Sequence, residues 1–104
     1  MIKTISTDKA PAAIGPYSQA KVVGNLVFTS GQIAINPANG EIEAVTIEEQ
    51  TKQVCENIKN LLLASGSDLD SVVKTTCFLK NMEDFATFNG IYAEYFTSKP
   101  ARSC

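Results

Sequence analysis

Residues 46–66 read TIEEQTKQVCENIKNLLLASG, and this stretch decides the fold class because it predicts the longest regular element of the chain. Thr46 followed by Glu49 is a capping box, in which hydroxyl and carboxylate satisfy backbone groups at a helix N-terminus. Gly66 suits the left-handed conformation that commonly ends a helix. Between these signals, apolar residues recur at helical spacing and charged residues take the opposite face: Val54, Ile58, Leu61 and Leu62 against Glu48, Glu49, Lys52, Glu56 and Lys59. The stretch predicts an amphipathic helix with one face to bury.

Strand patterns precede this helix. Ser18–Val23 and Leu26–Ile33 predict two strands joined across Gly24-Asn25, a two-residue hairpin signal. Residues 2–6 predict a further short extended segment. The prolines and glycine of residues 10–16 prevent regular structure between this segment and the strand that starts at Ser18. The N-terminal half therefore predicts strands that pair beside the helix.

A strand and a second helix follow. Val72–Leu79 is rich in β-branched residues and predicts a strand. A helix is expected to start within Asn81–Asp84 and to end at Pro100, and Ala101–Cys104 heads into another strand. The helix carries an aromatic stripe that should pack on the sheet, made of Phe85, Phe88, Tyr92 and Tyr95.

This order of elements predicts an α+β fold in which two helices cover one face of a single β-sheet, within one domain over residues 1–104. The other face, with Val72 and Phe78, would stay bare in a monomer. Self-association is the natural way to cover it.

Composition excludes several classes of function. The net charge is −2 and no lysine cluster occurs, so no basic footprint for nucleic acid is expected. No apolar run approaches the ~20 residues that span a membrane. Three widely spaced cysteines without a C-x-x-C pair favour a reduced, cytoplasmic setting. The chain has no histidine, so Ser-His-Asp and Cys-His catalysis within one chain are excluded, and no metal site is expected.

Arg102, the only arginine, is the best sequence clue to function. A guanidinium is planar, permanently charged and forked, so it matches a carboxylate or phosphate better than the flexible point charge of a lysine. A surface ion pair with an acidic side chain is the simpler explanation from composition alone.

Three motifs, taken together, resemble those of a known family: Gly15-Pro16-Tyr17-Ser18-Gln19-Ala20, Phe28-Thr29-Ser30-Gly31-Gln32 and Pro100-Ala101-Arg102-Ser103-Cys104. With Phe88-Asn89 and Tyr92–Phe96 between them, the whole chain resembles the reactive intermediate deaminase A (RidA) family, also called YjgF/YER057c/UK114. The resemblance implies a chorismate-mutase-like fold, assembled as a homotrimer with clefts at the subunit boundaries. It also implies hydrolysis of 2-enamines and 2-imines, such as 2-aminoacrylate, to 2-oxo acids and ammonia, without a cofactor.

The resemblance assigns roles to six residues. Arg102 would hold the substrate carboxylate, and Tyr17 would contact substrate or water; otherwise Tyr17 is an amphipathic core residue. The remaining candidates for substrate contact are Ser30, Gly31 and Asn89. Cys104, two residues after Arg102 on an expected strand, would share its face and help to line the site; otherwise it is an inert buried cysteine. A glycine-permitted bend explains Ser30 and Gly31 equally, and a helix-surface amide explains Asn89. Cys55 and Cys77 are expected in the core, without a functional role.

One feature of the family is not matched. Its members carry an acidic residue near the last strand that is commonly assigned to the attacking water, and this sequence ends before that strand. We therefore expect the given chain to be incomplete at its C-terminus. Two other functions stay open: a non-catalytic module that binds 2-oxo acids, and a ribonuclease, which the negative net charge disfavours.

Overall fold

Helix α1 (Ile47–Ala64) forms as predicted and is the longest element of the computed structural model, which describes residues 1–104. The Thr46 hydroxyl accepts the Glu49 backbone N–H at 3.1 Å and donates to the Glu49 carboxylate at 2.9 Å. Gly66 has a φ of 82°, the left-handed conformation that lets the chain turn away after the last helical turn. The cap by Thr46 and the stop at Gly66 are confirmed, whereas the Glu49 carboxylate bonds the Thr46 hydroxyl and not the backbone N–H that a full capping box requires.

The N-terminal strands form an antiparallel sheet in the order β1-β2-β3. Their bounds are β1 (Ile2–Ile5), β2 (Ala20–Val23) and β3 (Leu26–Thr29). The strands β2 and β3 are shorter than predicted. Ser18 and Gln19 before β2 turn toward other groups, since Gln19 bonds an adjacent loop and the Ser18 carbonyl accepts the hydroxyl of Ser30. The hairpin across Gly24, whose φ is 59°, is confirmed.

The C-terminal half contains two short parallel strands around a helix. The elements in order are the 3₁₀ helix η1 (Leu69–Ser71), β4 (Lys74–Thr76), the 3₁₀ helix η2 (Met82–Asp84), α2 (Phe85–Tyr95) and β5 (Ala101–Ser103). Strands β4 and β5 pair with each other and not with β3, so the hydrogen bonding divides the strands into two sets. Helix α2 ends at Tyr95, five residues before Pro100, so the predicted end is wrong. Its cap is Phe96, whose ψ of 68° is not helical.

Strand β4 covers only the middle of the predicted Val72–Leu79 strand. Val72 is the C-terminal cap of η1, and the strand starts two residues later. Because Val72 lies outside the strand alternation, its side chain packs with the helices, against Cys55, Tyr92 and Phe96. The expectation that Val72 lies on the bare face is therefore wrong.

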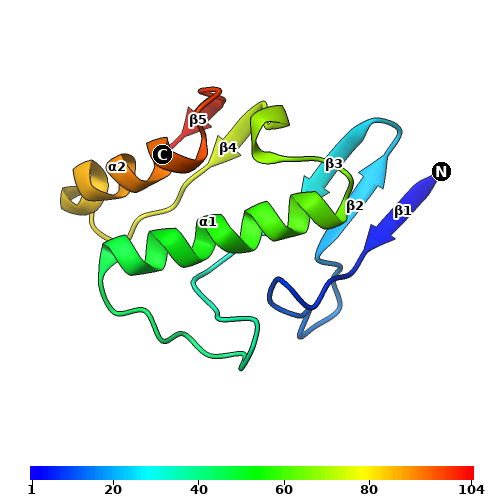
Figure 1. Ribbon diagram of the computed structural model, residues 1–104, viewed down its shortest axis with the longest axis horizontal. Coiled ribbons are helices and arrows are strands. Elements are labelled where there is room, and N and C mark those ends of the chain that lie inside the picture. The colour runs from blue at the N-terminus through cyan, green and yellow to red at the C-terminus, as the bar shows by residue number, and fades with distance from the viewer.

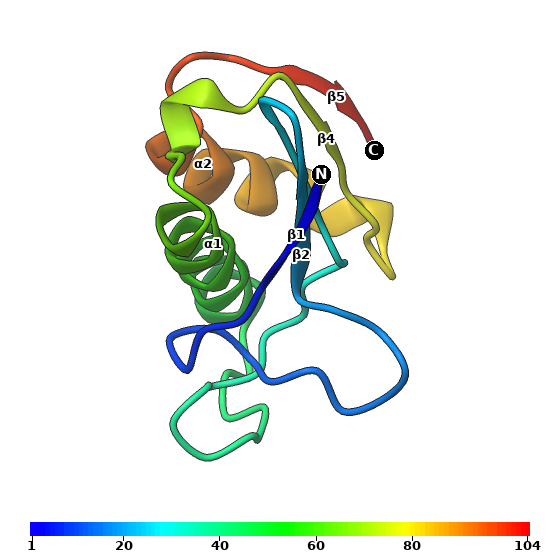
Figure 2. The same cartoon turned by 90° about the vertical axis from the view of Figure 1, so that its right-hand side faces the viewer.

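Both helices cover the same face of the strands, which stand edge-on in Figure 2. One core cluster lies under the C-terminal half of α1 and consists of Ile5, Ala10, Ala20 and Leu61. The other lies between α1 and α2 and contains Cys55, Tyr92 and Phe96. The opposite face leaves Phe28 60% exposed and Phe78 92% exposed, so a bare apolar face is confirmed for Phe78.

These layers confirm the predicted α+β class with two helices on one face (Figure 1). Neither helix combines the length and the apolar character that crossing a membrane requires.

Candidate functional site

Strand β5 brings Arg102 onto the helix-covered face. Arg102 is opposite Thr75 in the parallel pair of β4 and β5, and both side chains point toward α2. Alternation along a strand turns Ala101 and Ser103 to the other face, where Ser103 accepts a hydrogen bond from Lys74 at 2.8 Å. Strand β5 therefore points the Arg102 guanidinium to one face and the Ser103 hydroxyl, with its partner Lys74, to the other.

Three residues of α2 hold the Arg102 side chain. The guanidinium carbon lies 4.7 Å from the centre of the Tyr92 ring and 5.3 Å from that of Phe85, within cation–π range. Its Nη1 donates to the Asn89 side-chain oxygen at 2.5 Å. The Tyr92 hydroxyl is fixed in turn by Thr75, at 2.7 Å. The guanidinium is oriented by neutral groups.

A cavity of about 360 Å³ opens beside this guanidinium. Its lining consists of Asn89, Tyr92, Ala93, Phe96, Lys99, Pro100 and Arg102. The lining includes two cations and no acidic side chain, and Asn89, the side-chain acceptor of Arg102, is neutral. A guanidinium has five donors, so one bond to Asn89 leaves most of the fork free for an anion. Chemically, the cavity suits a small molecule with a carboxylate.

Of the predicted site residues, the structure brings Asn89 and Arg102 together. Asn89 is three residues before Tyr92 on α2, so one helix face presents both to the strand. The hydrogen bond to Arg102 holds the Asn89 side-chain amide in position, although this amide is only half-buried.

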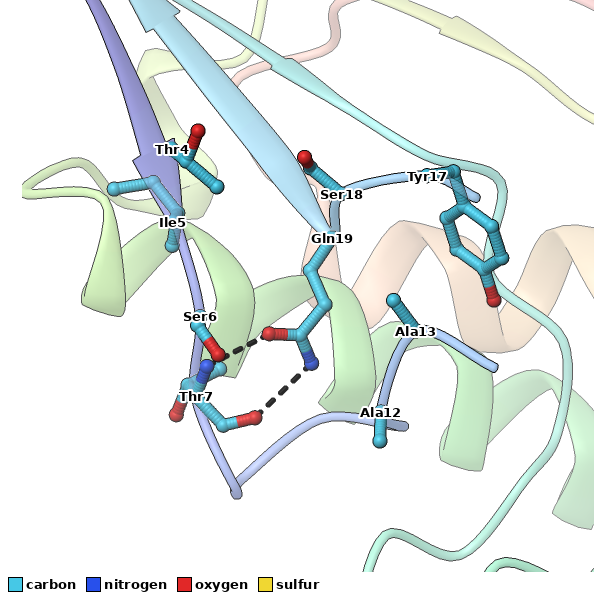
Figure 3. Close-up of a pocket in the computed structure, with 9 residues that line it drawn as sticks. All are labelled: Thr4, Ile5, Ser6, Thr7, Ala12, Ala13, Tyr17, Ser18 and Gln19. Carbon is cyan, nitrogen blue, oxygen red and sulfur yellow. Dashed lines mark hydrogen bonds between the residues drawn. The ribbon is translucent and has the colours of Figure 1, made fainter. Parts of the chain in front are cut away.

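Tyr17 lies in a different place. It lines a second cavity of about 290 Å³, whose wall is made by residues Thr4–Thr7, Ala12, Ala13 and Tyr17–Gln19 (Figure 3). The ring is 50% exposed, and its hydroxyl accepts the Ile14 backbone N–H at 3.4 Å. The alternative of a core tyrosine is therefore wrong, because half of the side chain is open to solvent.

Ser30 and Gly31 follow β3 on the same end of the molecule as Tyr17. The Ser30 hydroxyl donates to the Ser18 carbonyl at 2.6 Å, which ties Ser30 to the Tyr17 segment. Gly31 is exposed, and a Cβ at this position would meet no atom within 4 Å. Internal packing therefore does not require a glycine at position 31.

Within one chain the predicted residues thus form two separate groups. The loop that carries Tyr17 and strand β5 that carries Arg102 lie at opposite ends of the molecule (Figures 1 and 2). Neither cavity contains residues of both groups.

The sixth candidate, Cys104, is two residues after Arg102 and lies beside Cys77, the residue that follows β4. Burial raises the pKa of the Cys77 thiol, and so do the charge and hydrogen bond of Cys104, while Thr75 and Arg102 act in the opposite direction. Cys55 is buried between the helices, and burial, with smaller effects of Cys77 and Glu56, raises its pKa to about 12. Cys55 is an inert core thiol, as predicted.

Sequence reasoning missed two supporting residues. Gln19 is 4% exposed, and its amide accepts from Thr7 N–H and donates to the carbonyls of Thr7, Ala10 and Pro11 at 2.7–3.2 Å. It shapes the loop around the Tyr17 cavity, and Figure 3 shows the bonds to Thr7. The sequence predicts only a core role for Tyr92, although its ring also contacts the Arg102 guanidinium. Its position three residues after Asn89 was the available signal.

No group of three or more His, Cys, Asp or Glu side chains is arranged to hold a metal ion.

Comparison with known proteins identifies the family. The family model described as Endoribonuclease L-PSP matches residues 7–104. A RutC family protein of Pyrococcus abyssi is 55% identical over 101 residues, covering 96% of this chain and 80% of that protein. The 2-iminobutanoate/2-iminopropanoate deaminase of Escherichia coli K12 is 47% identical over 108 residues, covering 100% of this chain and 84% of the enzyme.

The crystal structure of E. coli TdcF with bound serine has a TM-score of 0.93 at 40% identity and covers 98% of this chain and 83% of that chain. Matches of this extent cover the three motifs and both groups of candidate residues. The chain therefore belongs to the Endoribonuclease L-PSP family, the family of reactive intermediate deaminase A (RidA) and YjgF.

Proposed function

We propose that this protein hydrolyses 2-imines and 2-enamines of carboxylic acids, such as 2-aminoacrylate, to 2-oxo acids and ammonia. The observation that carries the proposal is the oriented guanidinium of Arg102, which faces a cavity lined by two cations and no acidic side chain. Two relatives support it: the E. coli deaminase acts on 2-imino acids by its name, and TdcF is described with bound serine, an amino acid that carries a carboxylate.

In this proposal Arg102 binds the substrate carboxylate and so places the neighbouring imine carbon. A carboxylate takes two parallel N–H bonds from the fork, and the Tyr92 and Phe85 rings hold the plane of the fork before substrate arrives. Asn89 holds one nitrogen. Preorganisation of this kind lowers the entropy cost of orienting the substrate.

The chemical steps need few groups. A proton reaches the terminal carbon of an enamine and gives the imine; water then attacks the imine carbon, and ammonia leaves the tetrahedral adduct. Positioned acids and bases typically contribute 10²–10⁴-fold to such transfers. Tyr17, which is half-exposed, is the proposed contact for water or substrate, and Ser30, Gly31 and Cys104 are proposed to line the site.

We propose that the two groups of residues meet across a subunit boundary in a homotrimer. Within one chain Tyr17 and Arg102 line different cavities, and Phe28 and Phe78 expose an apolar face that a second copy would cover. Mixed assemblies test this directly: chains with Tyr17→Ala and chains with Arg102→Ala, refolded together, should regain activity that neither has alone. A monomeric mass by light scattering would contradict the shared cleft.

The activity itself is tested by a coupled assay. A pyridoxal-phosphate dehydratase releases 2-aminoacrylate, and 2-oxo acid formation is followed with and without this protein. We expect 2-oxo acid to form faster in the presence of the protein than in the uncatalysed reaction. No acceleration at any protein concentration would contradict it.

A non-catalytic binder is the second candidate. The serine in the TdcF structure favours it, because a carboxylate ligand at a related fold does not by itself imply turnover. Saturable binding of 2-oxobutyrate without rate enhancement would establish this alternative. The family model's description as an endoribonuclease finds less support, since the net charge is −2 and the chain has a single arginine.

A further inference from the structure

Two cysteines, Cys77 and Cys104, lie directly after the paired strands β4 and β5. The parallel register pairs Thr75 with Arg102 and Thr76 with Ser103, and the Cys77 N–H donates to the Ser103 carbonyl at 2.8 Å. The next pair in this register is Cys77 with Cys104. Neighbouring strands lie about 4.8 Å apart, within the roughly 4.4–6.8 Å between Cα atoms that a disulfide spans.

Alternation puts both thiols on one face. Cys77 is two residues after Thr75, and Cys104 is two residues after Arg102, so both share the face that α2 covers. The two thiols also interact, because the charge and the hydrogen bond of Cys104 are among the causes that raise the Cys77 pKa. Both are free thiols.

Their exposure differs in a way that sets the order of reaction. Cys104 is exposed, while Cys77 is half-buried and packs against the cluster of Cys55, Tyr92 and Phe96. An oxidant from solvent therefore meets Cys104 first. The thiolate is the reactive form of each cysteine.

We propose that Cys77 and Cys104 form a peroxide-reactive dithiol, in which Cys104 reacts first and Cys77 then closes a disulfide within the same chain. The disulfide would join the ends of β4 and β5 covalently, and it would involve Cys104, which is also proposed to line the deaminase site.

The reaction balances with one peroxide for two thiols. The Cys104 thiolate attacks one oxygen of hydrogen peroxide; the O–O bond breaks, giving a sulfenic acid and, after proton uptake, water. The Cys77 thiolate then attacks the Cys104 sulfur, the S–O bond breaks, and hydroxide leaves as a second water. The peroxide gains two electrons, one from each sulfur, and both thiol protons end in water.

Cys55 provides an internal comparison. It is 3% exposed, packs in one cluster with Tyr92 and Phe96, and has a pKa raised to about 12, so it is the least reactive of the three thiols. Tryptic cleavage separates the cysteines, because Cys55 falls in residues 53–59, Cys77 in residues 75–80 and Cys104 after Arg102.

The test treats the full chain with stoichiometric hydrogen peroxide, blocks free thiols and maps non-reduced tryptic peptides by mass spectrometry. We expect residues 75–80 linked to the Cys104 peptide, loss of this product on reduction, and Cys55 recovered as a free thiol. Mixing isotope-labelled and unlabelled chains should give no mixed pairs if the bond is within one chain.

Matched variants isolate each thiol. Cys55→Ala should keep the linked peptide, whereas Cys77→Val, which retains a strand-forming residue, should abolish it and leave Cys104 to reach the sulfinic acid. Cys77→Ser serves as a second replacement with the same expected loss. The proposal is overturned if the unmodified chain gives sulfinic acid at Cys104 with Cys77 still free, if mixed-label pairs dominate, or if Cys55 joins the main product.

Discussion

Replacing Arg102 with lysine or alanine separates the role of its charge from the role of its forked shape. Lysine keeps one positive charge but loses the planar guanidinium that rests on Tyr92 at 4.7 Å and on Phe85 at 5.3 Å. Alanine removes both the charge and the hydrogen bond to Asn89. The two variants should therefore differ from each other as well as from the parent.

The structure sets the expected size of each loss. One nitrogen of the guanidinium is bound by Asn89, so a carboxylate would take two bonds from the rest of the fork. Each charge-assisted bond contributes about 1.5–3 kcal/mol, and the half-exposed position of Arg102 favours the lower end. Losing both is about 3 kcal/mol, or roughly 100-fold in kcat/KM for Arg102→Ala, and losing one is roughly tenfold for Arg102→Lys.

The assay follows 2-oxo acid release from 2-aminoacrylate generated in place, after subtraction of the uncatalysed rate. Lys59→Gln is the matched control, because it removes one exposed cation on α1, outside both cavities. Thermal unfolding of each variant shows whether a lost rate reflects a lost fold. If Arg102→Ala matches the parent rate while folded, Arg102 does not hold the substrate and the assignment fails.

Three further predictions concern stability. Asn57→Leu should lower the free energy of unfolding by about 2 kcal/mol in urea titrations, because the fully buried amide donates to the Ile33 and Ile35 carbonyls at 3.1 and 2.9 Å; an unchanged midpoint would contradict this. Gln19→Leu should cost about 3 kcal/mol and also reduce activity, since four hydrogen bonds of the loop beside Tyr17 are lost, and full activity in a folded variant would separate that loop from the site. Burial raises the pKa of the Cys55 thiol from 9.0 to about 12 in the folded chain, so the unfolded chain loses this proton at lower pH. The free energy of unfolding should therefore fall as pH rises from 9 toward 12. In urea titrations at pH 8 and 10, Cys55→Ala should show a smaller fall of the midpoint than the parent.

Local signals in the sequence were sufficient for the elements that depend on local interactions. The hydroxyl of Thr46, the carboxylate of Glu49 and the left-handed Gly66 act within a few residues of each other, so the bounds of α1 followed from the sequence. Strand lengths did not follow. Ser30 and Gln19 have good strand neighbours, but their side chains bond to loops that lie close only after folding.

The site divides in the same way. That Arg102 suits a carboxylate followed from its chemistry, but its support did not, because Asn89 and Tyr92 meet it only when α2 packs on β5. Tyr17 belongs to a motif of the sequence, yet in the folded chain it lines a different cavity from Arg102. Contacts between residues that are far apart in the sequence depend on how the elements pack, and the spacing of residues along the chain does not reveal them.

By itself, the sequence determined the α+β class, the ends of α1 and the chemical identity of the one guanidinium, since these depend on residue type and on spacing of a few positions. Only the tertiary structure decided that Val72 turns inward, that Asn89 and two aromatic rings orient Arg102, and that Cys77 faces Cys104. The physical reason is that these contacts join residues on different elements, and their geometry is fixed only when helices and strands pack together.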